Sequence, residues 1–509
     1  MQKGIVPMKK ILLLPLDERP CNFEFPYKIF NSADMEIVRP AKLGNKKIPA
    51  EFEDIKNFLL KNAAEADAAV ISVDTLLYGG LIPSRLHHLE ALEADRRLDV
   101  IREMKRLNPQ IKLYVFQCIM RCPSYSSADE EPDYYETCGA EIHQLGKFTH
   151  MNSLGMCGAD EMDELTKKVP NDFLEDYKNR RKFNLDYNIK TLDMVEDGTV
   201  EVLVIPQDDS APYGFTAIDQ KTVRNAINEK LLNDKVLMYP GADEVAMTLL
   251  SRVLNDLNGR RPMVYLRYAS VKAPFLIPNY EDRSLGETVK YHLMSAGCVV
   301  TEELSKADFA LCITAPADKM EEADLQPACN IQYDVERNLT EMLWFMDKCL
   351  ADGIPVALLD NAYVNGGEIA LLKLLNKKDM LLKLIAYAGW NTSANSMGTV
   401  IAQAVHYLYY GKCRAHYDFL VERYLEDVGY CSVIRGSTTV NELPSMGMSY
   451  FDVKEQRGVV ARMVQDKLNR FKDEYLTAIA KDIEVTDVYM PWSRMFEVGI
   501  SAKYKGDIE

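Results

Sequence analysis

The stretch Val200-Glu-Val-Leu-Val-Ile-Pro-Gln-Asp208-Asp209 decides the fold that we expect for this chain. It is an apolar run that ends in two adjacent carboxylates. Buried parallel strands are continuous apolar segments, because helices cover both faces of their sheet. In α/β barrels and open α/β sheets, the side chains that do chemistry follow the carboxyl ends of such strands. The stretch therefore predicts a buried parallel strand with a functional site at its end.

Seven further apolar runs have the same form, each followed by polar or acidic residues. They cover residues 11–16, 69–73, 111–116, 236–239, 263–266, 356–359 and 384–387. Segments between them, such as 50–64 and 245–257, carry apolar residues at the three- and four-residue spacing of a helix. Alternating strands and helices predict a parallel sheet with helical crossovers. A count of eight strands favours a closed (β/α)8 barrel, the TIM-type α/β fold, over an open sheet.

Two regions exceed a minimal barrel, which we place in residues 1–400. Residues 270–345 contain one predicted helix and two predicted strands, and we expect a small α/β insertion there, between the sixth and seventh strands. Residues 400–509 are predicted to form a C-terminal helical region. The polar stretch 121–160 is expected to be one long loop, of the kind that is usually functional or mobile.

Composition excludes several classes of protein. The chain has 509 residues, a net charge of −16 and no run of lysine and arginine, so we expect no nucleic-acid partner. No segment approaches the roughly 20 apolar residues of a membrane helix, and the N-terminus lacks the features of a signal peptide. The eleven cysteines are scattered, several of them inside apolar runs, which indicates reduced core residues in a cytoplasmic protein. The oligomeric state stays open, a homo-oligomer included.

The adjacent carboxylates of Asp208 and Asp209 are the sharpest functional signal. Burying two carboxylates at a strand end costs several kcal/mol unless each is hydrogen-bonded or neutralised. One response is a raised pKa on one of them, which suits a general acid. The alternative is that Asp209 and Ser210 merely cap the next helix. We favour a functional role, because a Pro-Tyr-Gly sequence typical of a loop follows the pair.

Further polar side chains follow the other predicted strands. The segment Leu359-Asp-Asn-Ala-Tyr-Val-Asn-Gly-Gly-Glu368 offers partners for sugar hydroxyls, or else an Asn-rich turn with glycines at positive φ. Tyr387-Ala-Gly-Trp-Asn391 offers an indole platform for a sugar face, or else an indole that fills the end of the barrel. Arg19 and Arg85 are expected to form structural ion pairs at the rim. The candidate binding residues are Asp17, Asp74, Asp243, Glu244, Asp360, Asn361, Asn365, Trp390 and Asn391.

Four motifs resemble a bacterial domain-of-unknown-function family, number 4127. They are Leu14-Pro-Leu-Asp-Glu-Arg-Pro20, Val73-Asp-Thr-Leu-Leu-Tyr-Gly-Gly80, Pro206-Gln-Asp-Asp209 and Ala388-Gly-Trp-Asn-Thr392. This resemblance covers nearly the whole chain, and the family name implies no activity.

A more distant resemblance links the chain to the O-GlcNAcase-type β-N-acetylglucosaminidases, which are (β/α)8 barrels. Their fourth strand ends in two adjacent aspartates, as the fourth predicted strand does here at Asp208-Asp209. The residues after the seventh and eighth predicted strands, 360–365 and Asn391 onward, are similar to that family's motifs. Two features depart from the pattern. Gly366 stands where the family has a second aspartate, with Glu368 as a substitute, and no proline follows the asparagines of the eighth motif.

The second resemblance implies substrate-assisted retaining hydrolysis of an N-acetylhexosaminide, an exception to the two-carboxylate scheme of most glycosidases. The sugar's own acetamido oxygen would attack the anomeric carbon. Asp208 would hold the acetamido N–H, and Asp209 would protonate the leaving oxygen and then activate water. Asn361 and Asn391 would hold hydroxyl groups. No metal or organic cofactor would be required.

Three alternatives stay open. The first is another glycosidase or sugar-processing hydrolase, with Asp243, Glu244 or Asp360 as the second carboxylate. The second is a metal-dependent hydrolase that uses the rim carboxylates, although the seven histidines show no ligand spacing. The third is a non-catalytic protein that binds a small carbohydrate without turnover.

Overall fold

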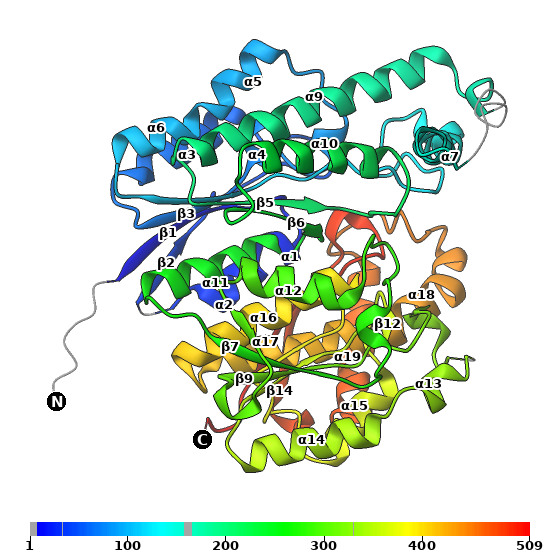
Figure 1. Ribbon diagram of the computed structural model, residues 1–509. Coiled ribbons are helices and arrows are strands. Elements are labelled where there is room, and N and C mark those ends of the chain that lie inside the picture. The colour runs from blue at the N-terminus through cyan, green and yellow to red at the C-terminus, as the bar shows by residue number, and fades with distance from the viewer. Residues whose placement is uncertain (1–7, 33, 157–164, 329, 509) are drawn as a thin grey trace. The chain divides into compact units, whose positions relative to one another are not determined.

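The computed structural model describes residues 8–32, 34–156, 165–328 and 330–508, and the chain divides into two compact units (Figure 1). The first unit comprises Met1–Glu18, Phe30–Leu249 and Tyr280–Asp282. The second unit comprises Arg19–Ile29, Leu250–Asn279 and Arg283–Glu509. Each unit contains a parallel sheet with helices between its strands.

The first unit is built on a six-stranded sheet in the order β2-β1-β3-β4-β5-β6. All five neighbouring pairs are parallel. Strands β3, β5 and β6 are buried along their whole length, which is why they read as unbroken apolar runs. The strands span Lys9–Leu14 (β1), Met35–Val38 (β2), Ala68–Ser72 (β3), Lys112–Phe116 (β4), Val202–Gln207 (β5) and Val236–Pro240 (β6).

Helices connect these strands, and one of them lies where we expected only a loop. Helix α7 spans Tyr135–Ser153 inside the stretch 121–160, so the expectation of a long loop is wrong for those residues; residues 157–160 lie outside the described part of the chain. Two glycines, Gly139 and Gly146, lie in this helix, and glycine lowers helix propensity, so the sequence did not predict a helix here. Gly146 is needed for packing, since a Cβ there would lie 2.6 Å from a ring carbon of Phe215. The other connecting helices are α3 (Phe52–Ala63), α4 (Val73–Tyr78), α5 (Ala91–Leu98), α6 (Val100–Leu107), α9 (Asn171–Glu196) and α10 (Phe215–Glu229). Helix α11 (Val245–Leu257) follows β6, and the division between the two units falls within it.

The second unit contains a five-stranded parallel sheet in the order β13-β11-β9-β7-β8. Strand β9 pairs with β7 on one side and β11 on the other. The segment 270–345, expected as an insertion, thus supplies the central strand and one edge strand of this sheet. A five-residue apolar run fits a central or a peripheral strand equally well, so its pattern does not reveal its neighbours. The strands span Met263–Tyr268 (β7), Val299–Thr301 (β8), Phe309–Ile313 (β9), Val356–Leu359 (β11) and Ala386–Ala388 (β13).

These pairings confirm the predicted α/β class with parallel strands. Each sheet has two edge strands, β2 and β6 in the first unit and β13 and β8 in the second. A closed ring of eight strands is a finer arrangement than these pairings show, and it stays a prediction. The four-residue strand β2 was not predicted, so the strand that precedes Asp208-Asp209 is the fifth along the chain and not the fourth.

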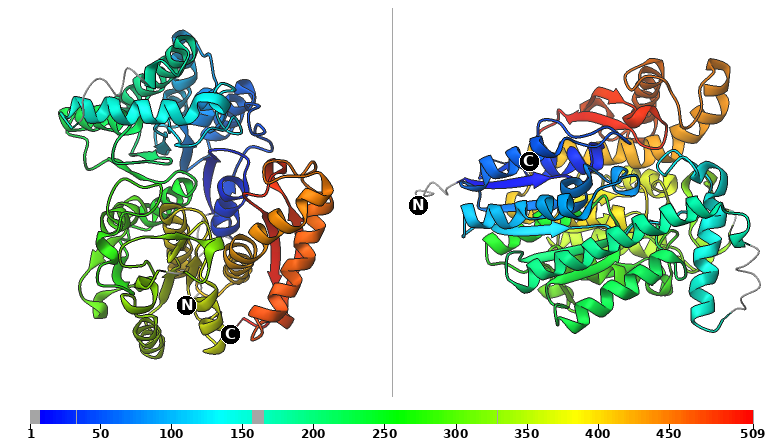
Figure 2. Two further views of the ribbon diagram at one scale, coloured as in Figure 1. Left: turned by 90° about the vertical axis from the view of Figure 1, so that its right-hand side faces the viewer. Right: turned by 90° about the horizontal axis from the view of Figure 1, so that it is seen from above.

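Helices dominate the end of the chain, which closes with a hairpin. Strands β14 (Ile483–Tyr489) and β15 (Gly499–Tyr504) pair antiparallel, and β14 packs on helix α19, with the hairpin in red and the helix in orange (Figure 2). The helices of the second unit are α1 (Pro20–Phe23), α2 (Phe25–Phe30), α12 (Leu285–Ser295), α13 (Gln332–Val335), α14 (Leu339–Ala351), α15 (Ile369–Lys377), α16 (Ser393–Tyr410), α17 (Arg414–Arg423), α18 (Arg435–Asn441) and α19 (Val459–Tyr475), with a π-helical segment Tyr424–Ile434 between α17 and α18.

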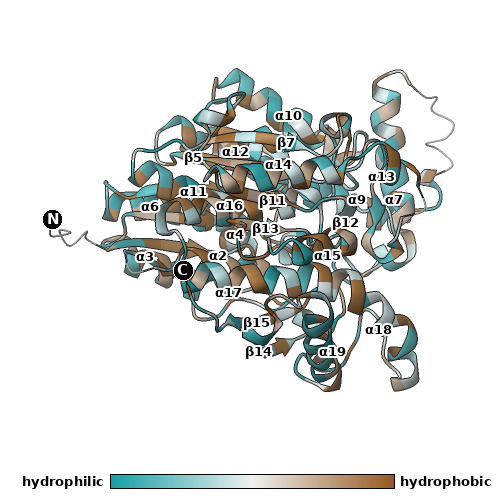
Figure 3. Ribbon diagram, turned by 90° about the horizontal axis from the view of Figure 1, so that it is seen from below, coloured by the Kyte–Doolittle hydropathy of each residue, from teal (hydrophilic) through white to brown (hydrophobic). Residues whose placement is uncertain are grey.

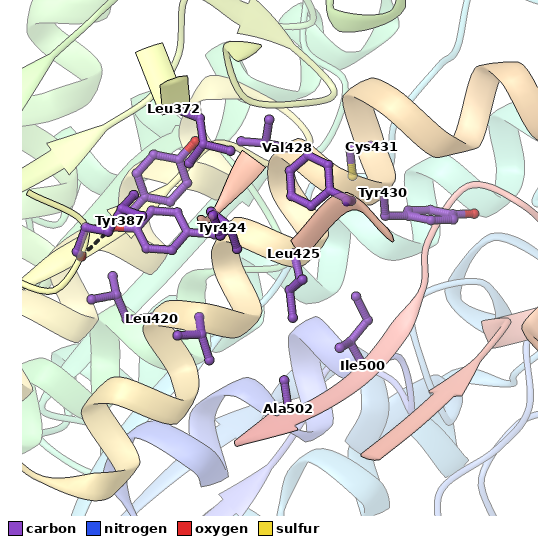
Figure 4. Close-up of a cluster of buried hydrophobic side chains, with 14 of the residues drawn as sticks. Leu372, Tyr387, Leu420, Tyr424, Leu425, Val428, Tyr430, Cys431, Ile500 and Ala502 are labelled. Atoms are coloured by element: carbon purple, nitrogen blue, oxygen red, sulfur yellow. Dashed lines mark hydrogen bonds between the residues drawn. The ribbon is translucent and has the colours of Figure 1, made fainter. Parts of the chain in front are cut away.

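The second unit has a large apolar core between its sheet and its C-terminal elements. Tyr387 of β13 and Tyr424 pack with ring centroids 4.8 Å apart, beside Leu420 and residues of β15 (Figure 4). In Figure 3 the strands β5 and β11 are mostly brown, the colour of hydrophobic residues, whereas the hairpin strands β14 and β15 and the outer helices mix brown with teal. Of the helices in the described ranges, none is both long and apolar enough to span a membrane.

Candidate functional site

The candidate site lies at the carboxyl end of β5, where Asp208 and Asp209 follow the strand. Asp209 has a φ of 43°, in the left-handed region that aspartate adopts more readily than most residues. The two carboxylates have separate partners. Arg85 Nη2 donates to Asp208 Oδ2 at 2.6 Å, and Arg121 Nη1 donates to Asp209 Oδ2 at 2.8 Å. Each aspartate is therefore hydrogen-bonded to a different arginine, and Arg121 Nη1 also lies 3.9 Å from Asp208 Oδ2.

Two glutamates join these arginines into one network, which we call the arginine–carboxylate cluster. Arg121 donates to Glu131 Oε1 and Glu130 Oε2, both at 2.8 Å. Arg85 Nη1 lies 3.2 Å from the same two oxygen atoms. The Glu131 side chain is fully buried, whereas the two aspartate side chains are 20% and 24% exposed. Four carboxylates thus surround two guanidinium groups, and the aspartates form the accessible edge of the cluster.

The backbone around β3 and β4 holds the two arginines in place. Arg85 ends a short 3-10 helix, Pro83–Arg85, that follows the glycines ending α4. Gly79 has a φ of 89°, and a Cβ there would lie 2.6 Å from Cβ of Pro49. Only glycine fits this position, which is a packing requirement and not a phosphate loop. The carbonyl of Arg121 accepts hydrogen bonds from Arg181 and from Tyr177 Oη.

Asp74 lies behind the cluster, in the first turn of α4 after β3. Its Oδ2 accepts a hydrogen bond from the backbone N–H of Cys118 at 2.8 Å, which ties β3 to the segment leading from β4 to Arg121. Burial raises the pKa of Asp74 to about 7, while the hydrogen bonds from Cys118 and the charge of Arg85 lower it. Asp74 is buried, and it is linked to the cluster both by its hydrogen bond to the Cys118 backbone and by the charge of Arg85.

The pKa of the Asp209 carboxyl is raised toward neutral pH. Burial raises its pKa to about 6, and the charge of Asp208 adds to the rise. Arg121 and Arg85 oppose both effects. A carboxyl group with a pKa near 6 retains part of its protons at neutral pH, as a general acid must.

The other candidates of the first unit share the carboxyl edge of its sheet. Asp17 follows β1, and Asp243 and Glu244 follow β6; all three are buried. Glu244 Oε2 accepts the backbone N–H of Ala242 at 3.0 Å, and a Cβ on Gly241 would lie 2.1 Å from Glu244 Oε1. Glu244 therefore closes the turn between β6 and α11 in a space that only glycine leaves open.

The remaining candidates belong to the second unit, where Asp360 is the centre of a buried network. Its Oδ2 accepts from Tyr387 Oη at 2.5 Å and from the backbone N–H of Glu368 at 2.8 Å. The Glu368 carboxylate in turn makes two hydrogen bonds of 2.7 Å to Arg337. Burial raises the pKa of Asp360 to about 7, and the charge of Glu368 adds to the rise. This network joins strand β13, through Tyr387, to the segment that follows β11 and to Arg337.

The asparagines and the tryptophan have mainly local partners. Trp390 is 5% exposed, and its Nε1 donates to Thr399 Oγ1 at 3.1 Å, so its indole fills the interior of the second unit. Asn365 donates its side chain to Glu322 at 2.9 Å and its backbone N–H to the carbonyl of Asn391 at 2.8 Å. Both have positive φ values, 63° and 48°, as turn residues do. Asn361 is buried, and within the described residues its Oδ1 has no hydrogen-bond partner.

The buried carboxyl of Asp360 predicts a pH-dependent stability. A raised pKa means that folding favours the protonated form, so its stabilising contribution is complete at low pH. The free energy of unfolding should fall as the pH rises from about 4 through about 7. Urea denaturation across this range measures the slope, which Asp360→Asn should reduce. The exposed Asp379→Asn is the control, and equal slopes in all three proteins would contradict the prediction.

Sequence reasoning missed three members of the cluster. Glu130, Glu131 and Arg121 lie in the stretch read as a loop, and only Arg121 had a signal, since it follows a predicted strand within five residues. Structural pairing was predicted for Arg85 and is what the structure shows. In the described ranges no group of three or more His, Cys, Asp or Glu side chains has the arrangement of metal ligands. The nine cysteines of those ranges are free, and eight of them are buried.

Comparison with known proteins places the chain in a family. Residues 11–501 match the family model described as "Protein of unknown function (DUF4127)". The chain belongs to the DUF4127 family. This confirms the first resemblance, since the DUF4127 match covers the four motifs that carry it. The resemblance to O-GlcNAcase-type enzymes stays a prediction.

Other comparisons add little to the DUF4127 assignment. No curated protein matches the chain. Among solved structures, the carboxyl transferase domain from Rhizobium etli pyruvate carboxylase with 3-bromopyruvate matches at 9% identity and a TM-score of 0.17. The match covers 80% of this chain and 48% of that chain, so this chain spans about half the length of that structure. A TM-score this low establishes neither a shared fold nor an activity.

Proposed function

We propose that this DUF4127 chain is a glycoside hydrolase that acts on an N-acetylhexosaminide by substrate-assisted retaining hydrolysis. The observation that supports it most is the pair of adjacent, partly exposed carboxylates with different settings. Asp208 is bound to Arg85, whereas Asp209 is bound to Arg121 and has a pKa raised to about 6 by burial and by its neighbour. Adjacent acids in different environments can divide the two tasks of this reaction.

The first step would form an oxazolinium ion from the substrate, with its N–H proton still on nitrogen and hydrogen-bonded to Asp208. Both ion pairs end on Oδ2 of their aspartate, so Oδ1 is the atom of each that would meet the sugar. Asp208 Oδ1 accepts the acetamido N–H and turns the acetamido oxygen toward the anomeric carbon. That oxygen forms a bond to the anomeric carbon while the bond to the leaving oxygen breaks. Asp209 gives its proton to the leaving oxygen, which departs as an alcohol.

The second step would restore the acetamido group. Asp209, now a carboxylate, takes a proton from a water molecule as that water attacks the anomeric carbon. The bond between the anomeric carbon and the acetamido oxygen breaks, and the sugar keeps its original configuration after two inversions. Arg121 steadies the Asp209 carboxylate between the two steps. A small carbohydrate substrate and a cytoplasmic location belong to the same proposal.

The test is turnover of chromogenic α- and β-glycosides by the purified full chain, N-acetylhexosaminides included. We expect hydrolysis of N-acetylhexosaminides and little of the parent hexosides, since these lack the acetamido nucleophile. Fluorinating the acetyl group should lower kcat/KM, because the acetamido oxygen becomes less nucleophilic. Equal turnover of plain hexosides would favour a two-carboxylate glycosidase. Activity lost on adding EDTA would favour a metal-dependent hydrolase, and sugar binding without turnover a binding protein.

Asp208→Asn should lower kcat/KM for the hydrolysis of aryl and of alkyl N-acetylhexosaminides to a similar extent. Orienting the acetamido group matters whatever the leaving group, and removing one preorganised polar partner typically costs about 10²–10³-fold in rate. The measurement is kcat/KM for one substrate of each kind. Asp95→Asn, which alters an exposed aspartate paired with Lys190, is the matched control and should keep full activity. A loss confined to alkyl substrates would assign Asp208, and not Asp209, the acid role.

A further inference from the structure

Two half-exposed tyrosines belong to the first unit: one is hydrogen-bonded to Arg121 of the arginine–carboxylate cluster, and the other contacts Ser210, which follows Asp209. Tyr125 is 48% exposed and Tyr280 is 45% exposed. Among the described residues of this unit, no other phenylalanine, tyrosine or tryptophan is more than about a third exposed. An aromatic residue that is partly open to water beside polar groups can offer an apolar face to a ligand.

Tyr125 is fixed to the arginine that holds the proposed acid. Its Oη accepts a hydrogen bond from Arg121 Nη2 at 3.2 Å. The Nη1 atom of the same guanidinium donates to Asp209 Oδ2 at 2.8 Å. One planar group therefore separates the ring of Tyr125 from the carboxyl that would protonate the leaving oxygen. This places Tyr125 on the leaving-group side of the anomeric carbon.

The backbone of Tyr280 contacts the side chain that follows the aspartates. Ser210, the residue after Asp209, donates its hydroxyl to the carbonyl of Tyr280 at 3.5 Å. Tyr280 has a φ of 67°, a left-handed conformation that is uncommon for a bulky side chain and costs roughly 1–3 kcal/mol. Such strain persists only where the surrounding structure imposes it. The backbone of Tyr280 is thus held in position, and the residue is 45% exposed.

We infer that Tyr125 and Tyr280 form a stacking platform for a second sugar ring, so that the substrate is an oligosaccharide whose leaving group is itself a pyranose. The apolar C–H face of a pyranose packs on an aromatic face, while the hydroxyl groups at its rim meet the polar atoms of the cluster. This inference rests on the proposed function for the identity of the leaving-group side. The two tyrosines would supply the aromatic surface that was predicted for Trp390, which is buried.

The test compares binding and turnover in ring-removing and ring-keeping variants of the full chain. The ligands are a β-linked N-acetylglucosamine disaccharide and the methyl glycoside of the single sugar, titrated by calorimetry. Tyr125→Ala and Tyr280→Ala should each weaken disaccharide binding by about 3–10-fold, the range for one aromatic stacking contact. Methyl glycoside binding should change by less than about twofold. Tyr280→Phe, which keeps the ring, should behave as the unmodified chain.

Leu231→Ala is the matched control, because Leu231 is 81% exposed in the same unit and lies at the opposite end of the β6 strand from the cluster edge. This variant should bind both ligands as the unmodified chain does. Should an alanine variant unfold, side-chain NMR of labelled tyrosines replaces it, with shifts of Tyr125 and Tyr280 expected on adding the disaccharide.

The outcomes separate this inference from the proposed hydrolysis. Disaccharide binding that the alanine variants weaken, without any turnover, would support the platform and refute the hydrolase. Turnover with disaccharide binding unchanged in both alanine variants would refute the platform and leave the hydrolase standing. A disaccharide that binds no better than the methyl glycoside would also refute the platform.

Discussion

Asp209→Asn will lower kcat/KM for an alkyl N-acetylhexosaminide by about 10²–10⁴-fold, the usual contribution of a general acid. Asparagine keeps the size of the side chain and can still meet Arg121, but it has no proton to give. An alcohol is a poor leaving group, so the unprotonated path is slow. An aryl glycoside leaves as a weakly basic phenolate, and its loss in rate should be much smaller. The ratio of the two losses is the measurement.

The pH profile provides an independent check on the same residue. Asp209 acts as an acid only while protonated, and its pKa is raised to about 6. In the unmodified chain, kcat/KM for the alkyl substrate should therefore fall as the pH rises through about 6. Asp209→Asn should lack this limb. Near-normal activity of Asp209→Asn would move the chemistry elsewhere, with Asp243 and Glu244 the next pair to replace.

Arg337→Met will lower the free energy of unfolding by about 3–5 kcal/mol, the usual cost of removing one partner from a buried ion pair. The Arg337 and Glu368 side chains are 3% and 5% exposed and make two hydrogen bonds of 2.7 Å. Methionine fills the volume of the arginine but leaves the Glu368 carboxylate buried without its charge partner. Urea denaturation measures the loss as a lower midpoint at unchanged slope.

Two controls separate the lost charge partner from lost packing. The double variant Arg337→Met/Glu368→Met removes both charges and should recover much of the stability, since apolar replacements of buried ion pairs are often neutral. Lys383→Met breaks an exposed pair with Asp379 and should cost less than about 1 kcal/mol. A double variant as unstable as the single one would show that the loss arises from packing.

The fold could be predicted where a local pattern is sufficient. The run 245–257 has unbroken helical spacing, and α11 has the same bounds. All eight predicted strands exist, because a buried parallel strand is apolar along its length. The partners of each strand could not be predicted. Strand β9 is central and β2 lies at an edge, but the sequence of neither strand shows its position in the sheet. Pairing depends on residues far away in the chain, and a count of strands cannot supply it.

The site was predictable only where its residues follow strands. Asp208 and Asp209 could be predicted, because two carboxylates at the end of a buried apolar strand are costly unless they are hydrogen-bonded or neutralised. Glu130 and Glu131 did not, since acidic residues in a polar stretch are ordinary, and only the fold shows that Glu131 is buried between two arginines. Positive φ at Asp209 and Tyr280 was equally invisible, because neither residue is glycine.

The order of segments in the two units has a consequence for how this chain is made. Residues Arg19–Ile29 belong to the second unit, although the first unit surrounds them in the sequence. Within this unit, Lys28 Nζ donates a hydrogen bond to the Glu422 carboxylate, which follows 394 positions further along the sequence. At about 5–20 residues per second, a ribosome needs roughly 20–80 s to supply that partner. The N-terminal helices must therefore stay unpaired through most of translation, and the second unit can be completed only when the last third of the chain has been released.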